Sequence, residues 1–188
     1  ASRNIERAKQ KRKWIISAAG NPDVEIIYID LASLKSVRAF VEEIFKREAP
    51  VALLMNNSGI MEQQGRTITE DGMERTVQVN YVGHYLLSRL LVPKMERGSR
   101  IVSMTSLTYR WGRIDFPTFF NSGCRGSYWR IFPYFNSKLA ITLFTIKLAK
   151  ELKDKGIMVN CADPGIVATD IIYFKMWFDS LTRVFFAP

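Results

Sequence analysis

Residues 51–59 read Val-Ala-Leu-Leu-Met-Asn-Asn-Ser-Gly, a short apolar run that closes in a polar turn. An apolar run bounded by such a turn signal is typical of a strand that is buried on both faces of a parallel sheet. This stretch therefore predicts an interior strand, and the neighbouring segments are interpreted outward from it.

Three further runs of mostly apolar residues predict strands at residues 24–29, 100–105 and 157–162. Helical spacing of apolar residues predicts a partly buried helix over 3–17, a helix from Leu34 that stops before Pro50, and long helices over 70–95 and 134–152. Ser33 and Thr69 are the candidate N-caps. Strands that alternate with helices predict an α/β fold with a parallel sheet built from right-handed βαβ units.

The composition limits the classes of protein. The chain has 188 residues, of which 47% are hydrophobic and 24% charged, and we treat residues 1–188 as a single domain. No apolar run is long enough to span a membrane, and the first residues lack the apolar core of a signal peptide. With two cysteines and one histidine, the sequence predicts no metal site.

The formal net charge of +9 raises the question of a nucleic-acid partner. Basic residues crowd the first 13 positions, but elsewhere acidic residues lie between them, and no nucleic-acid-binding motif accompanies the charge. We therefore expect no nucleic-acid partner, and a solvated helix face explains the charge.

Polar clusters follow each predicted strand, at Asp30, residues 56–59, residues 103–106 and residues 163–165. Ligands of open parallel sheets bind outside the carboxyl ends of the strands. The sequence thus predicts a binding site at one edge of the sheet.

Tyr134 and Lys138 are four residues apart on a predicted helix, so they project from one face. An ammonium beside a phenol favours the phenolate, which predicts a lowered tyrosine pKa suited to proton transfer. Taken alone, the pair is also compatible with two unrelated surface residues.

Several motifs together resemble the short-chain dehydrogenases/reductases. They occur in the family's order and comprise Asn56-Asn57-Ser58-Gly59, Asn80, Ser106, Tyr134-x-x-x-Lys138, and Asp163-Pro164-Gly165 with Thr169. Residues 66–74, 79–87, 100–106 and 136–144 resemble the retinol-dehydrogenase-like and WW-domain-oxidoreductase-like branch. The resemblance implies a Rossmann-like, doubly wound parallel sheet in three αβα layers.

The resemblance also implies an enzyme in which a hydride passes between NADP(H) and a carbonyl or alcohol. Tyr134 would be the catalytic acid or base, Lys138 would lower its pKa and hold the nicotinamide ribose, and Ser106 would polarise the substrate oxygen. Thr105 is the weaker candidate for that hydroxyl. Asn80 would complete a proton relay near Lys138, or else it simply marks a helix bend.

The implied cofactor site extends along the same edge. Asp30, with Leu31 after it, would contact the adenine, and Asn57, Ser58 and Gly59 would pass the adenosine ribose. Pro164, Gly165, Val167 and Thr169 would hold the nicotinamide end, although Val167 and Thr169 also fit a plain helix start. Arg3 would face the 2′-phosphate and favour NADP over NAD, unless it is one more charge on a basic helix.

The sequence departs from the family's pattern: Ser58 stands where alanine is usual, and none of its 11 glycines forms the glycine-rich turn that binds the pyrophosphate. We therefore expect a fold that is incomplete at both ends, and a non-catalytic binding or interaction module is the alternative function. Residues 166–188 are expected to be an aromatic lid, which favours an apolar substrate, or else their aromatic side chains pack against a further C-terminal part of the domain. A cytoplasmic protein is expected, and both peripheral membrane contact and homo-oligomer formation are compatible with the resemblance.

Overall fold

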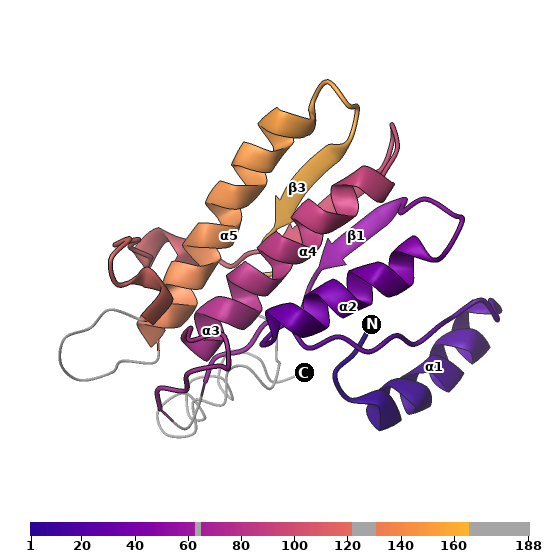
Figure 1. Cartoon of the computed structure of the whole chain (residues 1–188), viewed down its shortest axis with the longest axis horizontal. Coiled ribbons are helices and arrows are strands. Elements are labelled where there is room, and N and C mark those ends of the chain that lie inside the picture. The colour runs from indigo at the N-terminus through magenta and orange to yellow at the C-terminus, as the bar shows by residue number, and fades with distance from the viewer. Residues whose placement is uncertain (63–64, 122–130, 166–188) are drawn as a thin grey trace, which may run out of the picture.

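A parallel sheet of three strands lies at the centre of the chain (Figure 1). The computed structural model describes residues 1–62, 65–121 and 131–165. The strands are β1 (Leu53–Asn56), β2 (Arg100–Met104) and β3 (Met158–Ala162), in the order β1-β2-β3. Asn56 aligns with Ser103 and Ser103 with Cys161, so the strands end side by side. The predicted α/β class with a parallel sheet is confirmed.

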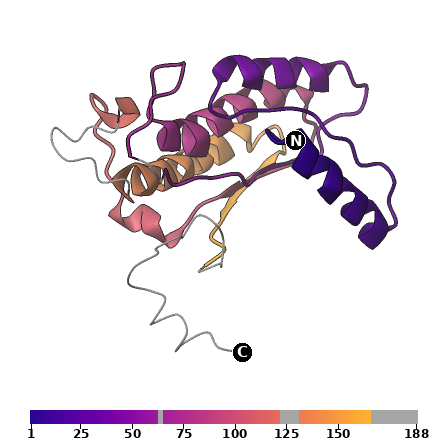
Figure 2. The same cartoon turned by 90° about the horizontal axis from the view of Figure 1, so that it is seen from below.

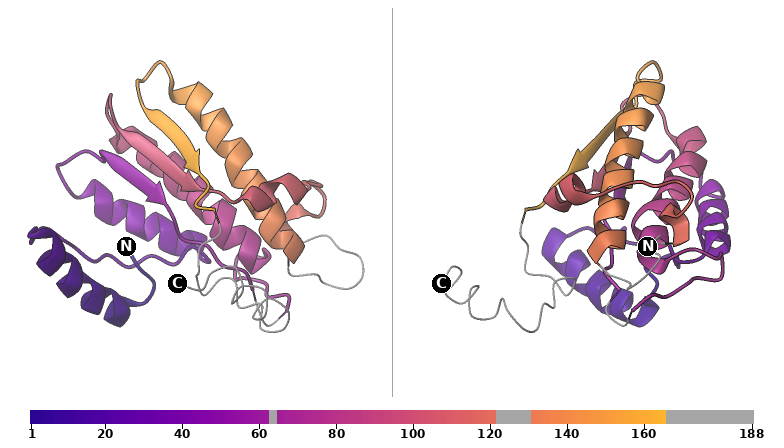
Figure 3. Two further views of the ribbon diagram at one scale, coloured as in Figure 1. Left: turned by 180° about the vertical axis from the view of Figure 1, so that it is seen from behind. Right: turned by 90° about the vertical axis from the view of Figure 1, so that its left-hand side faces the viewer.

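Three helices cover one face of this sheet as a single layer (Figures 2 and 3). They are α2 (Leu34–Phe45), α4 (Gly83–Leu91) and α5 (Ile131–Leu152). Shorter helical segments are α3 (Arg75–Val77), the π-helix η1 (Gln78–Val82), and the 3₁₀-helices η2 (Val92–Lys94), η3 (Leu107–Trp111) and η4 (Phe119–Asn121). The π-helix joins α3 directly to α4.

The core lies between the sheet and this helix layer. Ile101 on β2 is fully buried in one cluster with Ile141 and Leu148 of α5. A second cluster joins Val37 of α2 to Leu87 of α4. Burying an aliphatic side chain of this size contributes about 1.5–3 kcal/mol, so these two clusters fix the helices on the sheet.

β1 is buried on one face only, so the prediction of burial on both faces was wrong. Leu53 is 53% exposed and Met55 is 58% exposed, whereas Asn56 is buried. Side chains alternate along a strand, and Leu53 and Met55 point away from the α2, α4 and α5 layer. No described helix covers them on that side.

The helix predicted over residues 70–95 begins at Arg75 instead. Gly72 has a φ of +76°, which breaks any helix there, and the carboxylate of Glu74 caps the start by accepting from the N–H of Val77 at 2.8 Å. Thr69 therefore does not act as the N-cap.

The two carboxylates before that start stabilise α2. Asp71 Oδ2 accepts from the N–H of Leu34 at 2.9 Å, and the Ser33 hydroxyl donates to Glu70. Ser33 also accepts from the N–H of Ser36, as the sequence predicts for an N-cap. Negative charge at a helix N-terminus is favourable, so the 70–71 turn fastens α2 to the rest of the fold.

Residues 24–29 do not form the predicted strand. Their only ladder contact among the described residues is a parallel bridge from Tyr28 to Ser2, with N–H···O distances of 3.1 Å from Ser2 and 3.3 Å from Ile29. A single bridge is too short for a strand, although Ile29 still enters the core beside α2.

The first helix, α1 (Ile5–Ala19), lies apart from the helix layer, near the β1 side of the sheet (Figure 1). Asn4 caps its start and Gly20, at φ +63°, ends it. The prediction of a partly buried helix holds only weakly, because α1 has no fully buried residue and Trp14 is 68% exposed. No helix in the described part of the chain is long and apolar enough to cross a bilayer.

Candidate functional site

The carboxyl ends of β1, β2 and β3 bring the predicted polar clusters to one edge. Thr105 donates its backbone N–H to the carbonyl of Ala162 at 2.9 Å, which joins the ends of β2 and β3. A Cβ on Gly59, just after β1, would lie 3.6 Å from Lys138 Nζ. The clusters that follow β1, β2 and β3 therefore share one edge, as expected, and the binding site itself stays a prediction.

Tyr134 and Lys138 project from the same face of α5, as their spacing predicts. Lys138 Nζ lies 5.5 Å from the centre of the Tyr134 ring and donates to the carbonyl oxygen of Met104 at 3.0 Å. Lys138 is only 6% exposed, so the pair is not an accident of a solvated surface.

Ser106 meets the same tyrosine from the end of β2. Its side chain hydrogen-bonds with the Tyr134 side chain, and it caps η3 by accepting from the N–H of Thr108 at 3.4 Å. Two hydroxyl groups from different elements are therefore adjacent, which is the geometry required to hold one substrate oxygen between them.

Thr105 does not take that place. It is buried, and its hydroxyl lies 2.6 Å from that of Thr142 on α5. This leaves Ser106, which is only half-buried, as the more accessible candidate of the two.

The predicted lowering of the tyrosine pKa is not what the structure shows. Burial raises the pKa of Tyr134, and the negative charge of Asp163 acts in the same direction, while only the Ser106 hydrogen bond lowers it. The Lys138 ammonium lies over the ring and donates to Met104, and its attraction for a phenolate does not outweigh the effect of burial. Tyr134 is consequently a protonated phenol at neutral pH.

Burial lowers the pKa of Lys138 to about 8, against an opposing effect from Asp163. The side chain therefore remains mostly cationic at pH 7, although burial makes its charged form less favourable than it is in water.

Asn80 lies inside the π-helix η1, where helices often bend next to functional sites. Its Nδ2 donates to the carbonyl of Ile60 at 2.8 Å and to Ser137 Oγ at 3.1 Å, and Ser137 in turn donates to the carbonyl of Tyr134 at 2.7 Å. Asn80 thus marks a helix bend and also lies close to the tyrosine and lysine.

The predicted adenosine end forms around Asp30. Arg3 Nη1 lies 4.0 Å from Asp30 Oδ1, which also accepts from the N–H of Ala32 at 3.0 Å. Leu31 is buried, and its carbonyl oxygen would be only 2.7 Å from a Cβ on Gly83. Arg3 and Asp30 are therefore together at this end of the site.

The remaining predicted residues divide into two groups. Asn57 and Ser58 are exposed, and Gly165 donates to Asp163 Oδ1 at 3.0 Å in an exposed turn that includes Pro164. Val167 and Thr169, and the proposed lid over 166–188, lie outside the described residues.

Sequence reasoning missed His84. It lies on α4 with 4% exposure, and its Nε2 is 2.8 Å from the carbonyl oxygen of Ser58. The available signal was its position four residues after Asn80, on the same helix face.

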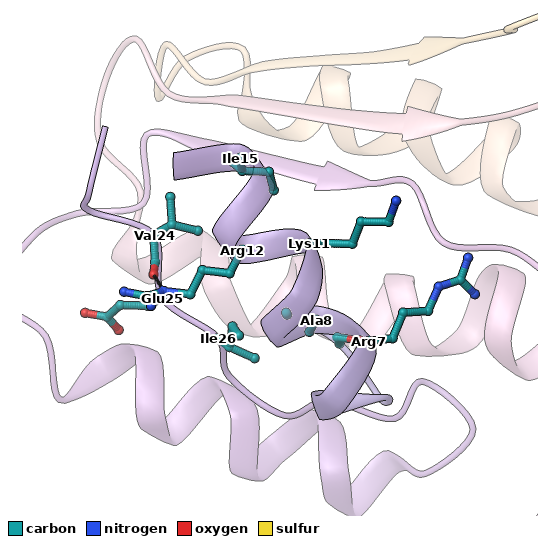
Figure 4. A pocket seen from close by; sticks show the side chains of 10 residues that line it. Arg7, Ala8, Lys11, Arg12, Ile15, Val24, Glu25 and Ile26 are labelled. Carbon is teal, nitrogen blue, oxygen red and sulfur yellow. Dashed lines mark hydrogen bonds between the residues drawn. The ribbon is translucent and has the colours of Figure 1, made fainter. Parts of the chain in front are cut away.

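A separate cavity of about 340 Å³ lies between α1 and residues 24–26 (Figure 4). Arg7, Lys11 and Arg12 from α1 line it, and Arg12 donates to the carbonyl of Val24. None of the predicted site residues lines this cavity. In the described residues, no group of three or more His, Cys, Asp and Glu side chains is placed to hold a metal ion.

Comparison with known proteins gives one family. The family model described as short chain dehydrogenase matches residues 1–175. Mouse retinol dehydrogenase 13 is 38% identical over 173 residues, which cover 91% of this chain and 51% of that protein. Human polyprenol dehydrogenase is 35% identical and is matched over 97% of this chain and 57% of its own length.

Solved structures agree on the fold. A short-chain dehydrogenase from Burkholderia cenocepacia, in complex with NADP, superposes with a TM-score of 0.72 at 25% identity, covering 98% of this chain and 69% of that one. The chain spans about half the length of the curated relatives it matches.

Proposed function

The chain belongs to the short-chain dehydrogenase family, and from that membership we propose that it transfers a hydride between NADP(H) and an apolar alcohol or its carbonyl counterpart. The observation that carries the proposal is the convergence of Ser106, Tyr134 and Lys138 at the carboxyl edge of the sheet. A surface pair would not be buried there beside a second hydroxyl group.

The described residues fit such a cofactor at two places. Gly59 has no side chain, which leaves room for a ribose beside Lys138 and Asn80. Arg3 lies next to Asp30 at the adenosine end of the site. A guanidinium matches the geometry of a phosphate, which supports NADP over NAD. When bound, NADPH would supply the hydride, since that chemistry belongs to the cofactor.

Each residue of the site has a role in the reduction. Ser106 donates a hydrogen bond to the carbonyl oxygen and draws electron density towards it. As the hydride reaches the carbonyl carbon, the C=O π pair moves to oxygen, and Tyr134 donates its proton there to give the alcohol. The raised pKa of Tyr134 keeps the phenol protonated and ready for this step.

Lys138 stabilises the phenolate that remains after the transfer. Its ammonium lies close to the Tyr134 ring, and its low exposure strengthens the attraction between the two charges. Asn80 and bound water are proposed to return a proton from this side. In the oxidation direction the same residues act in reverse, with Tyr134 as the base.

An apolar substrate is supported by exposed apolar side chains on the two elements that carry the hydroxyl groups. Leu107 and Trp111 on η3 are 49% and 59% exposed, and Phe132, two residues before Tyr134, is 42% exposed. Exposed apolar side chains on the elements that carry the polar groups suit a ligand with a long hydrocarbon part. The names of the retinol and polyprenol relatives point to the same substrate class.

The test is NADPH consumption by the purified, intact protein with three sets of substrates: long apolar aldehydes, short ketones and polar sugars. We expect turnover of the first set that is much faster with NADPH than with NADH. Binding of NADPH without turnover of any substrate would favour the non-catalytic binding module. A cytoplasmic location, peripheral membrane contact and pairing of subunits stay predictions.

A further inference from the structure

His84 is a buried titratable side chain that the proposed reaction does not use. Its Nε2 lies 2.8 Å from the carbonyl oxygen of Ser58, and a carbonyl oxygen can only accept. The proton of the neutral ring must therefore be on Nε2. Nδ1 is buried and has no hydrogen-bond partner among the described residues, which agrees with this tautomer.

Asn80 lies one helical turn before His84 and binds the backbone of Ile60, two residues after Ser58. Its Oδ1 accepts from the N–H of Ile60 at 2.8 Å, and its Nδ2 donates to the carbonyl of Ile60 at 2.8 Å. The backbone of residues 58–60 is thus fixed by three hydrogen bonds from one face of the η1 and α4 helix.

The position of the 58–60 turn sets how much room is left beside Lys138. A Cβ on Gly59 would lie 3.5 Å from Asn80 Oδ1 and 3.6 Å from Lys138 Nζ, so this glycine borders both side chains. Gly83, next to His84, packs more closely, because a Cβ there would lie 2.7 Å from the carbonyl oxygen of Leu31. One turn of helix therefore places both backbone segments that are proposed to contact the cofactor.

We propose that His84 is a positioning residue: as a neutral Nε2–H donor it holds the Ser58–Gly59 turn in the shape that the cofactor ribose needs beside Lys138. This inference rests on the proposed function. Burial lowers the pKa of His84 to about 4, and the positive charge of Lys138 acts in the same direction, so the ring remains neutral at physiological pH.

The decisive pair of variants is His84→Leu and His84→Gln. Leucine fills the space but leaves the Ser58 carbonyl without its donor, whereas the glutamine amide can still donate. We expect His84→Leu to weaken NADPH binding about tenfold or more, because the Ser58 carbonyl loses the donor that holds the turn in place. At saturating NADPH its kcat should stay within about threefold of the parent value, and His84→Gln should bind NADPH within about threefold of it.

The matched control is Arg89→Gln, an exposed change on the same helix, which should leave NADPH binding unchanged. Unchanged NADPH affinity in His84→Leu, or equally poor affinity in His84→Gln, would overturn the proposal.

Two readouts judge the role of His84 without activity. In the unmodified protein, ring ¹⁵N shifts should show a proton on Nε2 only, between pH 6 and 8; a proton on Nδ1 would overturn the proposal even if the leucine variant did not fold. Amide exchange at Ile60 should be faster in His84→Leu than in His84→Gln. If the unmodified protein fails to bind NADPH while these two results hold, the proposed function fails and the positioning of the turn stands.

Discussion

The ammonium of Lys138 donates to the carbonyl oxygen of Met104 at 3.0 Å, so the charge is fixed at the end of β2 in a nearly dry site. Because burial lowers the pKa of Lys138 to about 8, its charged form is less favourable in the folded chain than in water. Lys138 therefore destabilises the fold at the position where it is proposed to serve the reaction.

Lys138→Met should separate these two effects. Turnover should fall by at least about a hundredfold, because the charge beside Tyr134 is lost. The free energy of unfolding at pH 7 should stay level or rise by about 1–2 kcal/mol, because a desolvated charge has been replaced by an apolar side chain. Urea unfolding measures the second quantity, and Lys147→Met, an exposed change on the same helix, is the control.

The pH dependence of that stability has a defined sign. The pKa of Lys138 is about 8 in the folded chain against an ordinary value of 10.5, so its destabilising effect is absent above pH 10.5 and becomes complete as pH falls through 8. The difference in stability between the Lys138→Met variant and the parent should therefore shrink from pH 8 towards pH 10. A difference that stays constant over this range contradicts the assignment.

Tyr134→Phe should abolish turnover, with a loss of at least about a thousandfold, because the variant cannot give a proton to the substrate oxygen. NADPH binding, measured by fluorescence, should remain nearly intact, since the ring and Lys138 are unchanged. Tyr28→Phe is the control, because Tyr28 is a half-exposed phenol outside the site. Unchanged turnover in Tyr134→Phe would remove the proposed mechanism.

The lowered pKa of His84 predicts that the stability of the fold also changes at acid pH. The pKa of His84 is about 4 in the folded chain against an ordinary value of 6.5, so between these pH values the unfolded chain takes up a proton that the folded chain excludes. The stability due to His84 is complete above pH 6.5 and is lost as pH falls through 4, by about 3 kcal/mol at most. His84→Gln should lose less stability than the parent between pH 6.5 and 4.5; parallel urea unfolding curves for the two proteins contradict this.

Gly83→Ala and Gly59→Ala make a matched pair. A Cβ on Gly83 would be 2.7 Å from the backbone oxygen of Leu31, and neither chain segment can give way easily. We expect a loss of about 1–3 kcal/mol in thermal or urea unfolding. A Cβ on Gly59 meets only side chains, at 3.5 Å and beyond, so Gly59→Ala should fold normally but bind NADPH more weakly. The reverse order of stability would show that α4 does not pack on Leu31 as described.

Much of the fold could be predicted from local patterns. The apolar run before Asn56 and the spacing on α5 each depend on periodicity within one element, and both elements form close to where the sequence places them. The start of the third helix could not be predicted in this way, because Glu70 and Asp71 are committed to α2, which is distant in sequence. Burial of both faces of β1 likewise depends on what packs on the sheet, and not on β1 itself.

The candidate site shows the same division. The identities of Ser106, Tyr134 and Lys138 follow from motifs in the family's order, and the fold brings them together. The direction of the Tyr134 pKa was predicted wrongly, since spacing on a helix does not reveal that the ammonium is directed to Met104. His84 escaped notice because its partner is a backbone oxygen, which no side-chain pattern records.

The final prediction concerns cofactor preference. Arg3 lies 4.0 Å from Asp30 and is half exposed, so its guanidinium is available to a phosphate at the adenosine end. Arg3→Ala should weaken NADPH binding by about ten- to a hundredfold and leave NADH binding almost unchanged, because only NADPH carries the 2′-phosphate. Raising the ionic strength should weaken NADPH binding in the parent more than in the variant, since the lost contact is between charges.

Arg7→Ala, a change of a basic residue that lines the separate cavity, is the control for general loss of positive charge. If Arg3→Ala and Arg7→Ala reduce NADPH affinity equally, Arg3 acts only through net charge; a selective loss in Arg3→Ala supports direct recognition of the phosphate.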